Sequence, residues 1–177
     1  MQEHFRSIGQ ALIPVLIPLI TRCHDKGIPC FWTQHGHRNF KNDGGSLGRW
    51  WGEEDSIVYG TKAWQLMPEL ARYREKADAT IDSKMRYDAF MGTELGALLK
   101  SHGVKTLIIA GVMTNLCCET TARSAFNLDY NVVFLSDGCA TASKEMHEAT
   151  LLNLEFGFAK IVKTEDAIAM ISEGVLV

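Results

Sequence analysis

Cys117 is the residue whose place in the sequence points most clearly to chemistry. Residues 104–110 form a short β-branched run typical of a buried strand, and residues 115–128 have helical spacing. Cys117 is therefore expected at the carboxyl end of a parallel strand, where α/β sheets bind their ligands. The N–H groups of a helix start there would stabilise a thiolate and bind an oxyanion. The alternative is that Cys117, like Cys118, is a small buried hydrophobe.

The elements that must position this cysteine alternate between strands and helices. Strands are predicted at residues 28–33, 104–110 and 131–135, with weaker ones at 159–162 and 79–83. Helices are predicted at residues 9–26, 63–74, 91–102, 115–128 and 144–156, followed by a short helix capped by Thr164. This alternation predicts right-handed βαβ crossovers. We expect one domain over residues 1–177, a three-layer αβα, Rossmann-like fold with a mostly parallel sheet.

Two segments depart from a regular alternation. The chain enters its first helix almost at once, although doubly wound domains normally begin with a central strand, so the first strand is expected to be missing from the given chain. Residues 34–60 contain six glycines and two adjacent tryptophans, and we interpret them as a long irregular loop with a functional role.

Composition restricts the partners and the compartment. The net charge is −3, and there is no basic stripe, which argues against nucleic acid. Five cysteines without a C-x-x-C pair favour a reducing compartment, so we expect a cytoplasmic protein. The longest apolar run, residues 11–20, is too short to span a bilayer, so no membrane association is predicted.

Two motifs carry a family resemblance. Residues 111–126 read GVMTNLCCETTARSAF, and residues 84–95 read KMRYDAFMGTEL. They resemble the G-V-x-T-N-x-C-V-x-x-T-A-R and K-x-R-Y-S-A-F-x-G-T-x-L segments of the isochorismatase-like cysteine hydrolases. The likeness extends over residues 1–169. It is nearest to the plant-type nicotinamidase-like branch, through TQHGH, GSLGRWW and MHEATLLNLEFGFA.

The resemblance implies a catalytic set of aspartate, lysine and cysteine acting on an amide. Cys117 matches the nucleophile and Lys84 the lysine beside it. The Val112–Met113 peptide matches a non-proline cis bond, and the backbone N–H groups of Met113 and Cys117 match the oxyanion hole.

The aspartate of this set is not in the chain. In the family it ends the first strand, in a segment resembling I-D-M-Q-N-D-F. This chain begins MQEHF, at the residue directly after that aspartate. Glu3 is the nearest carboxylate, but strand alternation points it the other way. Either the chain starts at an internal methionine, or the protein is a non-catalytic paralogue.

The resemblance also raises a metal site, because many nicotinamidases bind a divalent ion through Asp-x-His and a later histidine. Here His35 stands in place of that aspartate, His37 matches the first histidine, and the later histidine is missing. Since a site needs three or more ligands, we predict no metal or other cofactor. His35 and His37 are interpreted as substrate-contacting or structural.

Four aromatic residues complete the predicted site. They are Trp50, Trp51, Tyr87 and Phe90, which could form a wall for a flat ring or fill the core beneath the long loop. The resulting hypothesis is a cysteine amidohydrolase for a small amide such as nicotinamide, working through an acyl-enzyme. The alternatives are vinyl ether hydrolysis of the isochorismatase type, disfavoured by Cys117, and the non-catalytic paralogue. The resemblance further implies a homo-oligomer.

Overall fold

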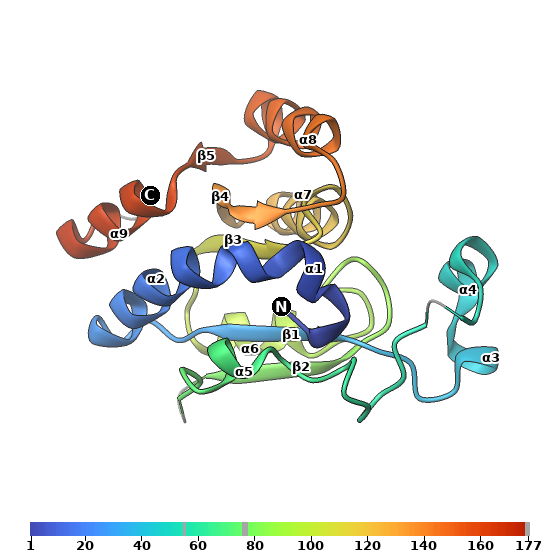
Figure 1. The fold of residues 1–177 in the computed structure, drawn as a ribbon. Helices are drawn as coiled ribbons and strands as arrows, with labels where there is room; N and C mark the ends of the chain where they lie inside the picture. The colour runs from blue at the N-terminus through green and yellow to red at the C-terminus, as the bar shows by residue number, and fades with distance from the viewer. Residues whose placement is uncertain (55, 76–77, 176–177) are drawn as a thin grey trace.

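Parallel strands flanked by helices make up the computed structural model, which describes residues 1–54, 56–75 and 78–175 (Figure 1). The strands are β1 (Phe31–His35), β2 (Ala79–Lys84), β3 (Thr106–Val112), β4 (Asn131–Ala140) and β5 (Lys160–Val162). The five predicted strands are thus present, with bounds shifted by up to a few residues. The α/β prediction with a parallel sheet is confirmed.

The helices come mostly between the strands. A run of short helical segments, η1 (Glu3–Phe5), α1 (Arg6–Gly9) and η2 (Gln10–Leu12), leads into α2 (Ile13–Asp25). Then follow α3 (Phe40–Asp43), α4 (Gly45–Trp51), α5 (Pro68–Ala71), α6 (Leu95–Ser101), the π-helical turn η3 (Thr114–Cys118), α7 (Glu119–Asn127), α8 (Lys144–Gly157) and α9 (Thr164–Glu173).

The side chains of β4 show why helices cover both faces of the sheet. Successive strand residues point to opposite faces. Val132 and Phe134 belong to a core cluster that includes residues of α6, α7 and α8, whereas Val133 and Leu135 belong to one with α2 and α9. An apolar side chain at every position therefore requires a helical layer on each side, and the three-layer arrangement follows.

The strands form two separate parallel sheets. β1 pairs with β2, and β4 lies between β3 and β5. Between β1 and β3 lies an apolar groove with a volume of about 530 Å³. Its lining includes Trp32 and Thr33 of β1 and Ile108 and Ile109 of β3. In the described part of the chain, no strand pairs with the facing edges of β1 and β3.

Two sequence predictions need correction. Residues 63–74 are helical only at Pro68–Ala71, because the N-terminal segment binds the backbone before it. Glu3 N–H donates to the Gln65 carbonyl at 2.8 Å, and His4 N–H donates to the Ala63 carbonyl at 2.9 Å. Residues 34–60 are not wholly irregular, since they contain α3 and α4. The glycines of this segment interrupt the apolar spacing that would otherwise indicate a helix.

The N-terminal helical run Glu3–Asp25 is long and apolar enough, by length and composition alone, to cross a membrane. Buried core helices and signal sequences near the N-terminus pass the same test, and 22% of the apolar window of this run is buried. In this structure Leu16, Leu19 and Ile20 of α2 are buried in the core.

Candidate active site

Lys84 and Cys117 meet at the carboxyl ends of β2 and β3. Lys84 is the last residue of β2 and is only 2% exposed. Its Nζ donates to Cys117 Sγ at 3.4 Å. A buried ammonium group needs a partner that offsets its lost hydration, and the sulfur of Cys117 supplies one. The pair predicted from the two motifs is therefore brought together by the fold.

The backbone changes direction at the end of β3, and Cys117 lies in the π-helical turn Thr114–Cys118 that follows. The register of β3 against β4 shifts between Ile109 and Gly111, and Gly111 has a φ of 118°, a conformation that favours glycine. The Val112–Met113 peptide is cis, as the resemblance implied. The Met113 carbonyl accepts the Leu116 and Cys118 N–H groups at 3.2 Å each. This compact turn holds Cys117 against Lys84.

The adjacent cysteines have different surroundings. Cys117 lines a pocket, whereas Cys118 is buried in the core, in the same cluster as Cys139. Cys118 is thus a packing residue, as expected from the sequence.

His147 of α8 links the turn Thr114–Cys118 to β4. Its Nε2 lies 2.9 Å from the Ser136 carbonyl, and its Nδ1 lies 2.9 Å from the hydroxyl of Thr114, a fully buried residue. A carbonyl can only accept, so Nε2 carries the proton and Nδ1 accepts from Thr114. The sequence analysis did not single out His147, although it lies in the MHEATLLNLEFGFA segment of the resemblance.

The pocket beside Cys117 has a volume of about 220 Å³. Its lining is mostly apolar and aromatic, which suits a small flat ligand. The predicted residues His35, His37, Trp51, Tyr87, Met113 and Cys117 all line it. The unpredicted residues are His4, Phe5, Phe40, Leu47, Gly52, Ser56, Ile57 and Leu116. The resemblance of MQEHF to a family segment could have indicated that His4 and Phe5 lie at the site.

Trp50 and Phe90 do not line this pocket. Trp50 is 80% exposed. Phe90 packs against the core and stacks on Tyr130, with 6.0 Å between the ring centroids. The aromatic wall is instead formed by Trp51 and Tyr87. Trp51 Nε1 donates to the Tyr87 hydroxyl at 2.6 Å, which connects α4 to the segment after β2.

His35 and His37 differ in their hydrogen bonding. His37 is 2% exposed, and its Nδ1 lies 2.9 Å from Asp43 Oδ1. The buried Nδ1 of His35 has no hydrogen-bond partner among the residues that the structure describes. Burial, followed by the charges of Lys84 and His37, lowers the pKa of His35 to about 3. His35 is therefore a neutral ring at physiological pH.

These two histidines do not fit a metal centre. Their ring centroids are 5.0 Å apart, but the described residues offer no group of three ligands that includes either one. A metal centre needs at least three converging ligands.

The start of the chain lies next to the Lys84–Cys117 pair. The Met1 amino group is buried, which lowers its pKa, and its charge interacts with Cys118, Cys117 and Lys84. Glu3 instead forms an ion pair with Arg6 at 2.7 Å, away from the pair. Gln2 fixes this segment, because its amide exchanges hydrogen bonds of 2.8 Å with the backbone of His35.

A thiol and a buried lysine at the carboxyl edge of parallel strands, beside a small pocket, define an α/β protein with a hydrolase-like site. Residues 1–166 match the Isochorismatase domain. The chain belongs to the isochorismatase family of hydrolases.

Known relatives support this assignment. The chain is 41% identical over 162 residues to Nicotinamidase 3 of Arabidopsis thaliana, covering 92% of this chain and 80% of that protein. It is 30% identical to a probable inactive nicotinamidase of the same plant, over 83% of this chain and 76% of that protein. The fold matches a cysteine hydrolase from Pseudomonas syringae with a TM-score of 0.86 at 22% identity, covering 93% of this chain and 82% of that one.

Proposed function

We propose that this protein is a cysteine amidohydrolase that hydrolyses a small, flat amide such as nicotinamide. The observation that carries the proposal is the contact of 3.4 Å between Lys84 Nζ and Cys117 Sγ, at the edge of an aromatic pocket. The similarity to Nicotinamidase 3 supports the choice of amide.

In the first half of the proposed reaction, the Cys117 sulfur adds to the amide carbonyl carbon. The ammonium group of Lys84 holds the sulfur as a thiolate and stays charged. The backbone N–H groups of Met113 and Cys117 bind the oxyanion that forms. The C–N bond then breaks as its nitrogen accepts the proton first taken from the thiol, and ammonia leaves.

In the second half, water hydrolyses the thioester. The base that held the thiol proton takes one from the water, and the oxygen adds to the acyl carbon. The C–S bond breaks, the carboxylic acid leaves, and Cys117 regains its proton. No metal ion has a role in this scheme.

The general base must be supplied by a residue other than those that line the pocket. No aspartate or glutamate lines it in the described part of the chain. The Met1 amino group is buried and its charge interacts with Cys117 and Lys84, so a residue joined to Met1 would lie near this pair. We propose that an apolar strand ending in aspartate, placed directly before Met1, fills the groove between β1 and β3 and supplies the base.

The experiment measures ammonia release from nicotinamide by three proteins. They are the 177-residue chain, the chain extended by such a strand ending in aspartate, and the same extension ending in asparagine. We expect the aspartate form to exceed the asparagine form by at least about 100-fold in kcat/KM.

The control pair uses the adjacent cysteines of the extended protein. Cys117→Ala should abolish turnover, whereas Cys118→Ala should retain it, because only Cys117 contacts Lys84. Equal turnover by the Cys117→Ala protein and its parent would refute the thiol mechanism. An inactive aspartate form with a folded circular dichroism spectrum would refute the amidase proposal.

A non-catalytic paralogue is the second candidate. It is favoured by the absence of a carboxylate from the described pocket lining and by the similarity to a probable inactive nicotinamidase. This candidate predicts that nicotinamide binds to the 177-residue and extended proteins without turnover in either. Isothermal titration beside the ammonia assay separates the two functions.

A further inference from the structure

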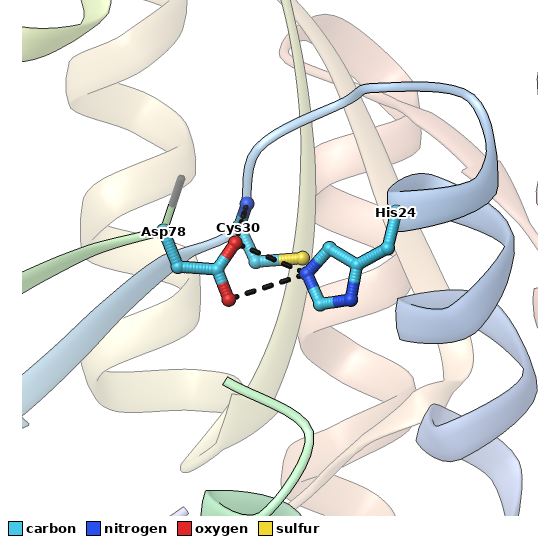
Figure 2. A group of neighbouring side chains, drawn as sticks. All are labelled: His24, Cys30 and Asp78. Atoms are coloured by element: carbon cyan, nitrogen blue, oxygen red, sulfur yellow. Dashed lines mark hydrogen bonds and ion pairs between the residues drawn. The ribbon is translucent and has the colours of Figure 1, made fainter. Parts of the chain in front are cut away.

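A second group of chemically active side chains lies at the opposite ends of the strands from Cys117. His24 is near the end of α2, Cys30 directly precedes β1, and Asp78 directly precedes β2 (Figure 2). One ligand atom from each lies within 4.8 Å of the other two. The parallel pairing that aligns Phe31 with Ala79 also brings Cys30 and Asp78 together.

The Asp78 carboxylate is held in a fixed orientation. Its side chain has no exposed surface, and it accepts the Cys30 N–H at 3.0 Å, Trp32 Nε1 at 2.8 Å and the Glu75 N–H at 3.0 Å. Burial raises its pKa, but these bonds and His24 outweigh burial and hold the pKa of Asp78 below its ordinary value. An ionised carboxylate therefore faces His24, with Nε2 to oxygen distances of 3.0 and 3.2 Å.

Cys23 is a second cysteine beside this group. It lies on α2 next to His24 and is buried in a core cluster against which Cys30 packs. The neighbouring Cys23 thiol and burial raise the pKa of Cys30, whereas the same contact lowers the pKa of Cys23. A cation would replace the protons that these thiols carry.

The ligand types and spacing match a particular class of cation. Zinc binds cysteine sulfur at about 2.3 Å and histidine nitrogen at about 2.0 Å, so ligand atoms on one ion lie roughly 3 to 4 Å apart. The His24–Asp78 separation already meets this requirement, and Cys30 needs a movement of only about 1 Å. Mixed sulfur, nitrogen and oxygen ligands favour zinc over magnesium or calcium.

We propose that His24, Cys30 and Asp78, with Cys23 as the fourth ligand, bind one zinc ion that ties the end of α2 to the starts of β1 and β2. Glu75, with a 57% exposed side chain, lies 3.5 Å from His24 Nδ1. Binding one Zn²⁺ releases the protons of the two thiols and forms two zinc–sulfur bonds. The role is structural and distinct from the Cys117 pocket.

The test uses cobalt chloride and zinc chloride on the fully reduced Cys117→Ser protein, so that the Cys117 thiol cannot compete for metal. We expect one cobalt ion per chain, a thiolate-to-cobalt charge-transfer band with tetrahedral visible bands, and displacement of cobalt by zinc. Titration in buffers of different ionisation enthalpy should report about two released protons.

Three variants in that background identify the site. Cys30→Ser and His24→Gln should each weaken cobalt binding by at least about 10-fold. Cys139→Ser is the matched control, because Cys139 is a buried cysteine in a different core cluster, and it should bind as its parent does. Circular dichroism confirms that each variant is folded. If Cys30→Ser does not fold, cobalt binding by His24→Gln decides whether this is the metal site.

Two outcomes would overturn the proposal. One is the absence of a thiolate–cobalt band in the reduced, folded protein. The other is an unchanged band in the His24→Gln or the folded Cys30→Ser protein, which would place the cobalt elsewhere.

Discussion

The two ends of the parallel strands each carry a cysteine site, and the neighbours of the sulfur differ. At the carboxyl end, Cys117 contacts the ammonium group of the buried Lys84. At the amino end, Cys30 lies within 4.8 Å of an imidazole and a carboxylate and packs against the cluster that contains Cys23. A cation favours a thiolate, whereas a neighbouring thiol and carboxylate favour the protonated form until a metal ion arrives. Reactivity therefore follows from the surroundings of each sulfur.

Alkylation by iodoacetamide tests this contrast directly. In the reduced protein without metal, Cys117 should react at least about 10-fold faster than Cys30. Lys84→Met should remove most of that advantage and leave the Cys30 rate unchanged. Peptide mass spectrometry over time measures both cysteines in one sample, and Lys100→Met, which changes an exposed lysine on α6, is the control. Equal rates for Cys117 and Cys30 would break the comparison.

Substitution of His147 should affect the carboxyl end alone. Because its ring bridges Thr114 and Ser136, His147→Ala should slow alkylation of Cys117 by about threefold while cobalt binding at Cys30 stays unchanged. His147→Gln should restore part of the rate, since its amide can donate to Ser136 and accept from Thr114. A loss of cobalt affinity in the alanine variant would show that the effect is global.

His35 gives the last predicted effect, on the pH dependence of stability. The unfolded chain binds a proton on His35 near pH 6.5, but the folded protein does not until about pH 3. Stability therefore falls as the pH falls below 6.5, by up to about 1.4 kcal/mol per pH unit from this group. Urea unfolding between pH 7 and pH 5 should show a shallower slope for His35→Gln. His102→Gln, at an exposed histidine, is the control, and parallel slopes in all three proteins would contradict the assignment.

The sequence predicted those parts of the fold that depend on local apolar patterns. The runs around Ile108 and Val133 have the β-branched composition of buried strands, and both are strands. The helix predicted at residues 144–156 is α8, and the hydroxyl of Ser143 directly before it accepts the Met146 N–H. The helix predicted at residues 63–74 was largely wrong because contacts with the distant N-terminal segment determine that backbone.

The candidate site was predictable only where a motif recorded its long-range contacts. Lys84 and Cys117 are 33 residues apart, and the two motifs placed them together. Aromatic type alone did not distinguish Trp51, which lines the pocket, from Trp50, which is exposed. The cluster of His24, Cys30 and Asp78 was missed because its members come from three elements and only strand pairing aligns them.

The groove between β1 and β3 has a consequence for how the protein opens and closes. Within the described residues, the two sheets share no hydrogen-bond ladder, so side-chain packing through helices such as α2 couples them. Each sheet can then form a foldon with its own opening free energy. Native-state hydrogen exchange should be faster in the pair β1–β2 than in β4, which is bonded on both sides. Lys84 lies on β2 and Cys117 follows β3, so the contact between them requires both sheets to be closed.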